Sequence, residues 1–562
     1  MLVLIFAPSG VGLREIKKKL EHVLKQDAKI VDIEEKLCSD SSITKKLLNE
    51  GRIKPSETLT MLKVVKYLPR DEVIKGWERA ISNALTEMRN FNGIKIITGH
   101  ALYYNSEYRE FYSPLIPNVI RELSDEYKLE LKKIALLIDD FPDMFQRLSY
   151  DGGLFDRNSL KRFRDRASQN SGSLDSNLIR IQWKKDAVDL LFQWRYTELI
   201  LLDNHAVQLG ADFMLWGVKN KLSAFIDWIR DNSIAVYLSH PISDVREQQT
   251  NNVYSKNWPA ITEEINNIPN KFNRLSIIMP TAIDELRFEL LGKVPSGKLA
   301  ARWPLMKNGD LIYSYPSKTG NAPEYSDFFT KNLKTSGIEK EISMIVNDLK
   351  NSVDLQVSAR DHLLVYRSKG IIVYRPFWNK NKTAYSQGVR SELTQWNLTA
   401  SENKRAVFIH FNEETKNIIE GEKQELINNV KASIRQRISS EITNNPDQLN
   451  HLMDAFFSKT NSIVSSTLGG GVEQEYYNRL PDQRDKWLTE AIRGVLFSKF
   501  SGGDIFGKNL ALLKKQQACI FLDRFDQLSE HVESITTFLR NGDDSIKDTL
   551  KDHVETLKTW FS

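Results

Sequence analysis

The stretch MLVLIFAPSGVGLREI at residues 1–16 joins an apolar run to a glycine-containing turn and the start of a helical pattern. An apolar run without polar alternation is typical of a parallel strand, because helices cover both faces of a parallel sheet. Four more such apolar runs follow, namely KIVDIEE, GIKIITGH, KKIALLIDD and DFMLWGVKN. Helical patterns separate them. This alternation predicts a parallel α/β domain over residues 1–231.

A second series of strands predicts another α/β domain over residues 232–415. Its apolar runs are IAVYLSHPIS, RLSIIMPTAIDELRF, GIIVYRP and RAVFIHF. Beyond residue 415 the sequence changes to amphipathic helical patterns, and only QQACIFLDRF resembles a strand. The predicted fold class is therefore α/β, with two consecutive parallel-sheet domains and a mostly helical C-terminal domain at residues 416–562.

The composition is that of a soluble protein with several domains, since 562 residues exceed what one hydrophobic core organises. The net charge of +5, from 78 basic and 73 acidic residues, is too small to indicate nucleic acid. Cys38 and Cys519 lack metal-ligand spacing, which predicts a reducing, cytoplasmic location without a zinc site or disulfides. No apolar stretch reaches about 18 residues, so no membrane contact is expected. No cofactor or metal is expected either.

The turn after the first run lies where a phosphate-binding loop would begin a helix. A full Walker A loop reads G-x-x-x-x-G-K-[ST], because its Lys and hydroxyl contact phosphate and Mg²⁺. Ala7 stands at the first glycine position here, Gly12 stands at the second, and Leu13 and Arg14 replace the last two residues. The residues left for an anion at the helix N-terminus are Ser9, Gly10 and Gly12.

Residues 1–230 resemble the P-loop nucleotide kinases through APSGVG, through LLIDD at 136–140 in the Walker B place, and through WRYTELILLD at 194–203. The resemblance implies a nucleotide-kinase-like fold, and the departure at Leu13 and Arg14 implies a degenerate one. Three interpretations stay open: a non-catalytic scaffold, a nucleotide-binding domain without turnover, and an active ATPase. In the plainest interpretation, Asp139 and Asp140 merely cap a strand.

In the second predicted domain, polar residues follow the strands at the edge where α/β sheets bind ligands. The first strand is followed by Ser239, His240 and Pro241, with Arg246 a little further on. The second is followed by Asp284. The third contains Tyr374 and is preceded by Asp361, which is expected to begin the helix that leads into the strand. Ser386, Gly388 and Glu392 follow in the stretch SQGVRSEL.

This order of motifs resembles the nucleoside 2-deoxyribosyltransferases and their nucleotide N-glycosidase relatives. The resemblance rests on the turn Ser239–Pro241, on Asp361 before a strand, and on the Gly-x-x-x-Glu signature at Gly388 and Glu392. It implies that Glu392 is the nucleophile and that Asp361 contacts the sugar or protonates the base. A carboxylate suits this role, because cleavage of an N-glycosidic bond places positive charge on the anomeric carbon.

The remaining residues complete the predicted pocket. His240 and Arg246 suit a sugar phosphate, and Tyr374 suits stacking on a base. Each assignment has a plainer alternative: Glu392 complements a helix dipole, His240 is a turn residue, Tyr374 fills the core, and Asp361 caps a helix.

The sequence thus favours an enzyme that hydrolyses or transfers the N-glycosidic bond of a deoxynucleotide or NAD. Fused to a kinase-like scaffold and a helical tail, such a domain is similar to toxic effectors of bacterial antiviral defence. The alternatives are a catalytically inactive nucleotide-sensing or assembly protein and, with weaker support, a nucleic-acid-binding helical C-terminus. The family resemblance also implies a homo-oligomer, and the helical tail is a candidate surface for that contact or for a protein partner.

Overall fold

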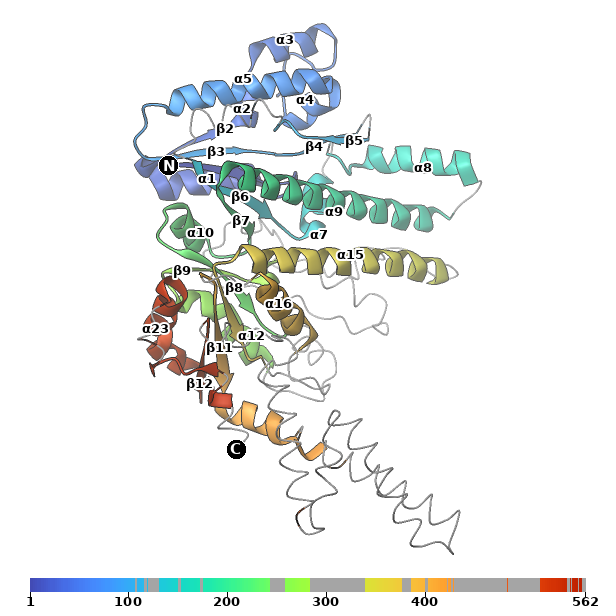
Figure 1. Ribbon diagram of the computed structural model, residues 1–562. Coiled ribbons are helices and arrows are strands. Elements are labelled where there is room, and N and C mark those ends of the chain that lie inside the picture. The colour runs from blue at the N-terminus through green and yellow to red at the C-terminus, as the bar shows by residue number, and fades with distance from the viewer. Residues whose placement is uncertain are drawn as a thin grey trace, which may run out of the picture. The chain divides into compact units, whose positions relative to one another are not determined.

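The computed structural model shows an α/β protein with two five-stranded parallel sheets (Figure 1). The described residues are 1–106, 109–115, 119, 131–149, 153–171, 175–242, 258–283, 339–376, 386–399, 403–421, 423–425, 428, 483, 516–542, 546, 548–553 and 555–557. Their contacts divide the chain into two compact units, Met1–Tyr237 with Gln248–Ser368, and Leu238–Glu247 with Lys369–Ser562.

The first sheet has the strand order β2-β3-β1-β6-β7. Its strands are β1 (Leu2–Phe6), β2 (Ala28–Asp32), β3 (Ile94–Gly99), β6 (Leu131–Ile138) and β7 (Asp212–Gly217). All four neighbouring pairs are parallel, and every residue of the central β1 is buried. The five strands predicted for this part of the chain are therefore confirmed.

The strand order reverses between β1 and β6 in this sheet. From β1 the chain proceeds to β2 on one side, whereas from β6 it proceeds to β7 on the other. Such a reversal leaves a crevice outside the carboxyl ends of the two strands, and this is the usual ligand-binding position of open α/β sheets. The loop at residues 7–12 and the residues after Ile138 lie at these two ends.

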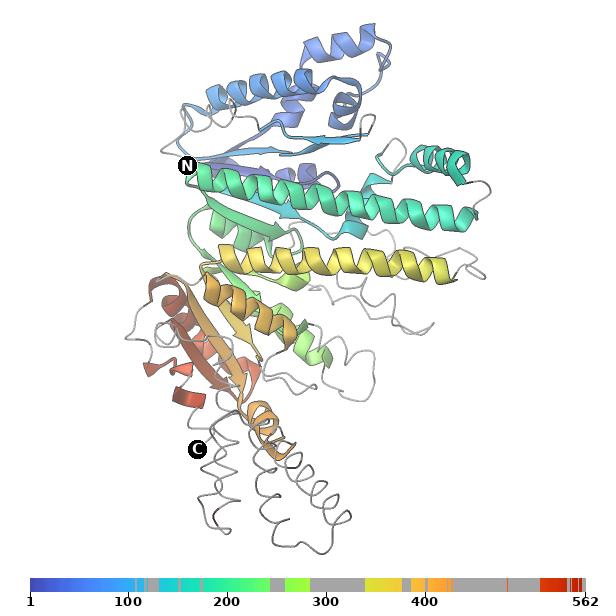
Figure 2. The ribbon, with the colours of Figure 1, turned by 45° about the vertical axis from the view of Figure 1, so that its right-hand side comes forward.

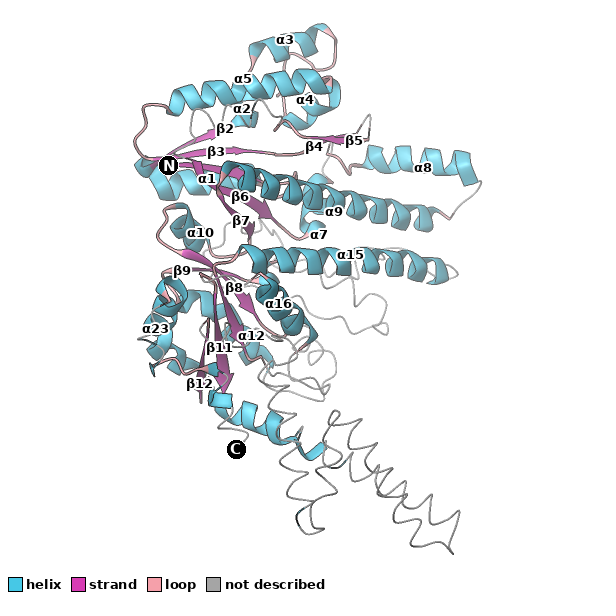
Figure 3. Cartoon of the chain, viewed as in Figure 1, coloured by secondary structure: helices cyan, strands magenta, loops and turns pink. Residues whose placement is uncertain are grey.

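Helices pack around the first sheet, and a short antiparallel pair of strands, β4 (Tyr103–Asn105) and β5 (Glu110–Tyr112), lies beside it (Figure 3). The described helices of the first unit are α1 (Leu13–Leu24), α2 (Ile33–Cys38), α3 (Ser41–Asn49), α4 (Met61–Tyr67), α5 (Arg70–Met88), α7 (Phe141–Leu148), α8 (Arg157–Ser171), α9 (Ser176–Leu209), α10 (Leu222–Ile229), α12 (Trp258–Lys271) and α15 (Glu339–Arg367), with short 3₁₀ turns at Lys25–Asp27 and Pro280–Ala282. The two long helices α9 and α15 run side by side (Figures 1 and 2). Among the described helices, none is long and apolar enough to cross a membrane.

The second sheet has the strand order β12-β11-β10-β8-β9. Its strands are β8 (Ile234–Ser239), β9 (Leu275–Ile278), β10 (Gly370–Tyr374), β11 (Arg405–Phe411) and β12 (Gln517–Leu522). If these five strands are numbered 1 to 5 along the chain and read from the β9 edge, their order is 2-1-3-4-5. This is one of the two common doubly wound arrangements. The order reverses between β8 and β10, so the carboxyl ends of these two strands border the second crevice.

The strand β12 lies within the region 416–562 that the sequence assigned to a mostly helical C-terminal domain. It pairs with β11 along its whole length, from Ala406–Gln517 to Phe411–Leu522. It is followed by a 3₁₀ turn at Phe525–Gln527 and by α23 (Leu528–Asn541), which contacts β11. This part of the region belongs to the second sheet, because an apolar strand buries its hydrogen-bonding edge by joining one. Most of the predicted helical patterns lie outside the described residues.

Two histidines are buried in the second sheet among aromatic rings. The ring of His553 stacks on the ring of Phe408 of β11, with 3.9 Å between the centroids. Its centroid lies 5.3 Å from that of His410, which is also on β11. His410 in turn stacks on Phe521 of β12. Burial lowers the pKa of His553 to about 3, and burial together with His553 lowers the pKa of His410.

The stability of the second sheet should fall in mild acid. Each histidine has a lower pKa in the folded chain than in the unfolded one, so its contribution to stability is present above about pH 6.5 and is lost as the pH falls. For His553 this loss extends toward pH 3. We expect a decrease of about 1.4 kcal/mol per pH unit for each histidine in that window. Urea unfolding between pH 7 and 4 measures this slope, which His553→Phe should reduce by about half. An unchanged slope in His553→Phe, or an equal effect of the exposed control His22→Gln, would contradict the assignment.

Candidate functional site

The carboxylate that the sequence singled out lies on the buried face of helix α16 (Gln387–Leu398). Ser386 caps this helix, since its Oγ accepts a hydrogen bond from the Val389 backbone N–H at 3.3 Å. The buried positions Val389, Glu392, Leu393 and Trp396 follow at helical spacing. Glu392 is the charged residue on this otherwise apolar buried face, and it is only 6% exposed.

Glu392 meets the end of strand β8. The hydroxyl of Ser239, the last residue of β8 and itself fully buried, donates a hydrogen bond to Oε2 of Glu392. The two residues are 153 positions apart in the chain. Because β8 and β10 border the crevice of the second sheet and α16 is the helix that follows β10, this contact lies at the expected ligand-binding position. The hydroxyl fixes the orientation of the carboxylate.

The structure gives the neighbouring predicted residues different roles. His240 and Pro241 are buried directly after Ser239, and Nδ1 of His240 lies 3.3 Å from the Leu238 carbonyl oxygen. Gly388 lies in the first turn of α16, and a Cβ added there would meet no atom within 4 Å. Tyr374 is fully buried, with its ring edge against Phe411 at 5.7 Å. Its place is therefore the core packing that the sequence left as the alternative to base stacking.

Asp361 does not begin a helix, contrary to the sequence-based expectation. It lies in the last third of the 29-residue helix α15, where it accepts hydrogen bonds at 2.9 and 2.7 Å from the guanidinium of Arg360. It also has no capping role, because the helical pattern continues without a break from Glu339 through this residue. Arg246 and Asp284 lie outside the described residues.

The loop that resembles a P-loop does form the turn between β1 and α1. Gly10 and Gly12 both have φ near +90°, the left-handed region that glycine adopts without strain, and Gly12 caps the helix. Helix α7 packs directly on this loop: a Cβ at Gly10 would lie 3.0 Å from the carbonyl oxygen of Met144 and 3.1 Å from the Leu148 side chain. Ser9 precedes this packed segment and is half-buried.

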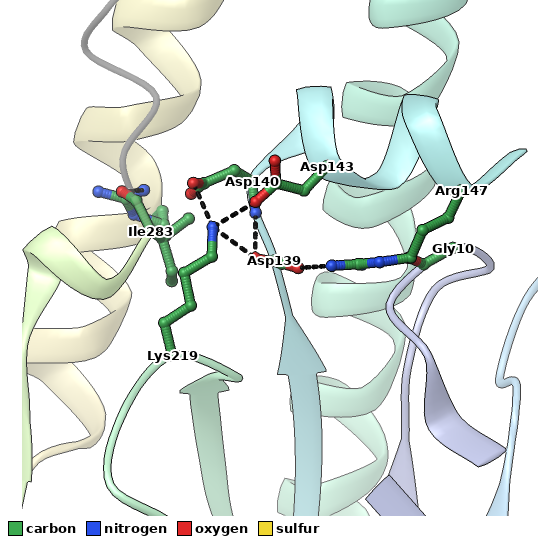
Figure 4. A network of polar contacts seen from close by, with 8 residues as sticks. Gly10, Asp139, Asp140, Asp143, Arg147, Lys219 and Ile283 are labelled. Atoms are coloured by element: carbon green, nitrogen blue, oxygen red, sulfur yellow. Dashed lines mark hydrogen bonds and ion pairs between the residues drawn. The ribbon is translucent and has the colours of Figure 1, made fainter. Parts of the chain in front are cut away.

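Three aspartates at the β1–β6 crevice surround the ammonium group of Lys219 (Figure 4). Nζ of Lys219 lies 2.9 Å from Asp139, 2.5 Å from Asp140 and 2.6 Å from Asp143, and the side chains of all four residues are almost completely buried. An ammonium has three N–H donors, so these contacts use all of them. The lysine therefore occupies the centre of the cluster, where a cation held by the three carboxylates would have to lie.

Arg147 completes the cluster from helix α7. Its guanidinium lies 2.5 Å from Asp139 and donates a second hydrogen bond to the carbonyl oxygen of Gly10 (Figure 4). Arg147 thus adds a second positive charge beside the aspartates, and its bond to Gly10 ties the β1 loop to the cluster. Burial of charges on this scale is tolerated only where the groups satisfy one another, which favours a permanently closed arrangement.

The sequence identified two of the three aspartates but not Asp143, Arg147 or Lys219. A signal for Lys219 was available, because it follows the predicted strand at residues 212–217, at the same sheet edge as Asp139. The pairing itself depends on strands 79 positions apart in the chain, and no local pattern specifies it.

No protein-family model matches the chain, and a search of curated proteins also found no match.

A second buried polar network lies at the carboxyl ends of β2 and β3. Glu34 accepts hydrogen bonds from His100 at 2.5 Å and from the hydroxyl of Tyr103 at 2.9 Å, and Glu198 of α9 accepts one from the Ala101 N–H at 2.8 Å. Burial raises the pKa of Glu198 to about 7, although His100 opposes this shift. Burial opposes protonation of His100, but the neighbouring Glu34 raises its pKa to about 9.

Replacing Lys219 should expose the repulsion among the three aspartates. We expect Lys219→Met to destabilise the protein by about 3 to 5 kcal/mol, because the buried aspartates lose the ammonium that they surround. Millimolar Mg²⁺ or Mn²⁺ should restore part of this loss in the variant and change nothing in the wild type. Thermal unfolding with and without chelator measures both effects. Stabilisation of the wild type by Mg²⁺, absent in Asp143→Asn, would show that the cluster binds metal despite the lysine.

The first unit should lose stability as the pH rises. Glu198 and His100 both have raised pKa values in the folded chain. The contribution of Glu198 is therefore complete below about pH 4.5 and lost by pH 7, and that of His100 is lost between about pH 6.5 and 9. The pKa shift of Glu198 corresponds to about 3 kcal/mol. Urea unfolding from pH 5 to 8 should give a flatter profile for Glu198→Gln than for the wild type; parallel profiles would refute the shift.

Proposed function

We propose that the second sheet carries a centre that cleaves the N-glycosidic bond of a nucleotide-like substrate, with Glu392 as the essential carboxylate. The observation that supports this most is the hydrogen bond between Ser239 and Glu392 at the β8–β10 crevice. It brings together two of the segments on which the resemblance to nucleoside 2-deoxyribosyltransferases rests. This hydrogen bond and the burial of Glu392 together hold the carboxylate in one orientation. A group that acts on a single carbon atom requires such a fixed orientation.

The chemistry follows from the charge that develops during cleavage. As the C1′–N bond breaks, its electron pair leaves with the base, which takes up a proton, and the anomeric carbon becomes positively charged. Glu392 stabilises that charge or forms a bond to C1′. Water then supplies the oxygen that ends on C1′ and releases a proton, or a second base takes the sugar in an exchange reaction. Ser239 is a positioning residue, because it acts through Glu392.

For the first unit, we infer a nucleotide-kinase-like scaffold that does not transfer phosphate. Three observations support this proposal: Leu13 and Arg14 replace the Walker A Lys and Ser/Thr, α7 packs on the loop at Gly10, and Lys219 lies among the aspartates. Mg²⁺-dependent hydrolysis of ATP needs a metal at that edge of the sheet. In the alternative for the whole chain, both sheets bind nucleotides and neither catalyses a reaction.

The proposal predicts a specific loss of activity. Incubation of the wild type with deoxynucleotides, nucleosides or NAD should release free base, which chromatography resolves, and an added second base distinguishes exchange from hydrolysis. Glu392→Gln should reduce the rate by at least about 1000-fold, and Ser239→Ala by about tenfold, because one orienting hydrogen bond contributes about 1.4 kcal/mol.

The exposed glutamate Glu413 provides a matched control, and Glu413→Gln should retain full activity. Base release that survives in Glu392→Gln would remove the proposed role of this residue. Saturable nucleotide binding without any product, even over long incubation, would instead favour the non-enzymatic alternative.

A further inference from the structure

Helix α8 of the first unit is strongly basic. Its 15 residues include five basic and one acidic residue, whereas the whole chain has 78 basic and 73 acidic residues. All six charged residues of the helix are exposed. The basic residues are Arg157, Lys161, Arg162, Arg164 and Arg166, and the acidic one is Asp165. The positive charge is therefore concentrated on this helix and faces solvent.

The five basic side chains of α8 form no ion pair with any described residue. Nε of Arg166 donates a hydrogen bond to the carbonyl oxygen of Arg162 at 3.3 Å, a contact within the helix that neutralises no charge. Arg157 and Lys161 are four residues apart, as are Arg162 and Arg166, and like charges at this spacing repel each other on a helix. A bound polyanion would relieve this repulsion.

The helix is held to its own unit by one side. It packs on α9 (Figures 1 and 2). Its start is fixed, because Asp156 accepts a hydrogen bond from the Ser159 backbone N–H at 2.8 Å and Phe155 stacks on Phe145 of α7 at 5.1 Å. The half-buried residues of its described part span about 100° of the helix surface. They are Ser159, Leu160, Phe163 and Ala167.

Two basic edges flank the opposite, outer face of α8. With about 100° of rotation per residue, the basic residues fall into two groups whose centres are about 150° apart. The first edge consists of Arg157, Lys161 and Arg164, and the second edge consists of Arg162 and Arg166. Between the two edges lie the exposed Asn158 and Asp165, on the side that points away from the half-buried residues.

We propose that α8 binds double-stranded DNA, with its outer face in the major groove and each basic edge on one of the two flanking phosphate backbones. A helix with its side chains is about 10–12 Å across, and the major groove is about 12 Å wide. Four of the five cations are arginines, whose planar guanidinium forms paired hydrogen bonds with phosphate oxygens. Asp165 then lies over the base edges, where a carboxylate accepts hydrogen bonds from cytosine amino groups.

The distribution of charge on α8 argues against other polyanions. A helix that lies on a membrane needs an apolar face for the lipid, but the apolar residues of α8 are half-buried on the side opposite the outer face. An acidic peptide segment along one edge would leave the other edge without a counter-charge. The two phosphate backbones of a duplex neutralise both edges at once.

Fluorescence anisotropy of a labelled random-sequence DNA duplex with the full chain tests the proposal. If all five cations contact phosphate, the logarithm of the binding constant should fall with the logarithm of the salt concentration with a slope of about −4.5. Arg162→Gln combined with Arg166→Gln should make this slope shallower by about 2, because two phosphate contacts are lost. Lys75→Gln combined with Arg79→Gln removes the same charge, at the same spacing, from exposed positions of α5 and should leave the slope unchanged.

Three results would overturn the proposal. The first is a wild type that does not bind the duplex at low salt. The second is an equal change of slope in the α5 variant, which would show that net charge rather than α8 determines binding. The third is tighter binding of polyglutamate than of the duplex, which would assign α8 to an acidic protein partner.

Discussion

The constraint on which both candidate sites depend is the reversal of strand order within a parallel sheet. Where neighbouring parallel strands send the chain in opposite directions, no crossover helix covers the gap between their carboxyl ends. The first sheet has this gap between β1 and β6, and the second has it between β8 and β10. In each case the gap contains buried acidic side chains, whose burial is unfavourable without a partner.

The two sheets solve this electrostatic problem differently. In the first, Lys219 and Arg147 neutralise most of the charge of Asp139, Asp140 and Asp143, and the resulting network ties β6, β7, α7 and the β1 loop together. In the second, a neutral hydroxyl orients Glu392. Carboxylates that surround a buried ammonium contribute mainly to structure. The proposed chemistry is assigned to the second sheet because Glu392 and Ser239 come together there, at the crevice where open α/β sheets bind ligands.

Most of the fold could be predicted from the sequence, because a strand buried on both faces leaves an uninterrupted apolar run. All five strands of each sheet coincide with such a run. The membership of β12 in the second sheet could not be predicted, since pairing across more than a hundred residues has no local signature. Asp361 was misplaced for a related reason: a polar pair inside a long helix is similar to a helix start. The sequence placed Ser239 and Glu392 in one pocket but did not predict that they share a hydrogen bond. The Lys219 cluster depends on burial, which only the structure supplies.

The central claim is that the Glu392 carboxylate faces an anomeric carbon in a nucleotide pocket. The most direct measurement is a crystal structure of the Glu392→Gln protein with a bound nucleotide substrate. The account predicts the sugar at the β8–β10 crevice, with C1′ within about 3.5 Å of the side-chain amide that replaces the Glu392 carboxylate in this variant. A nucleotide bound elsewhere, or bound there with its sugar turned away from α16, would contradict it.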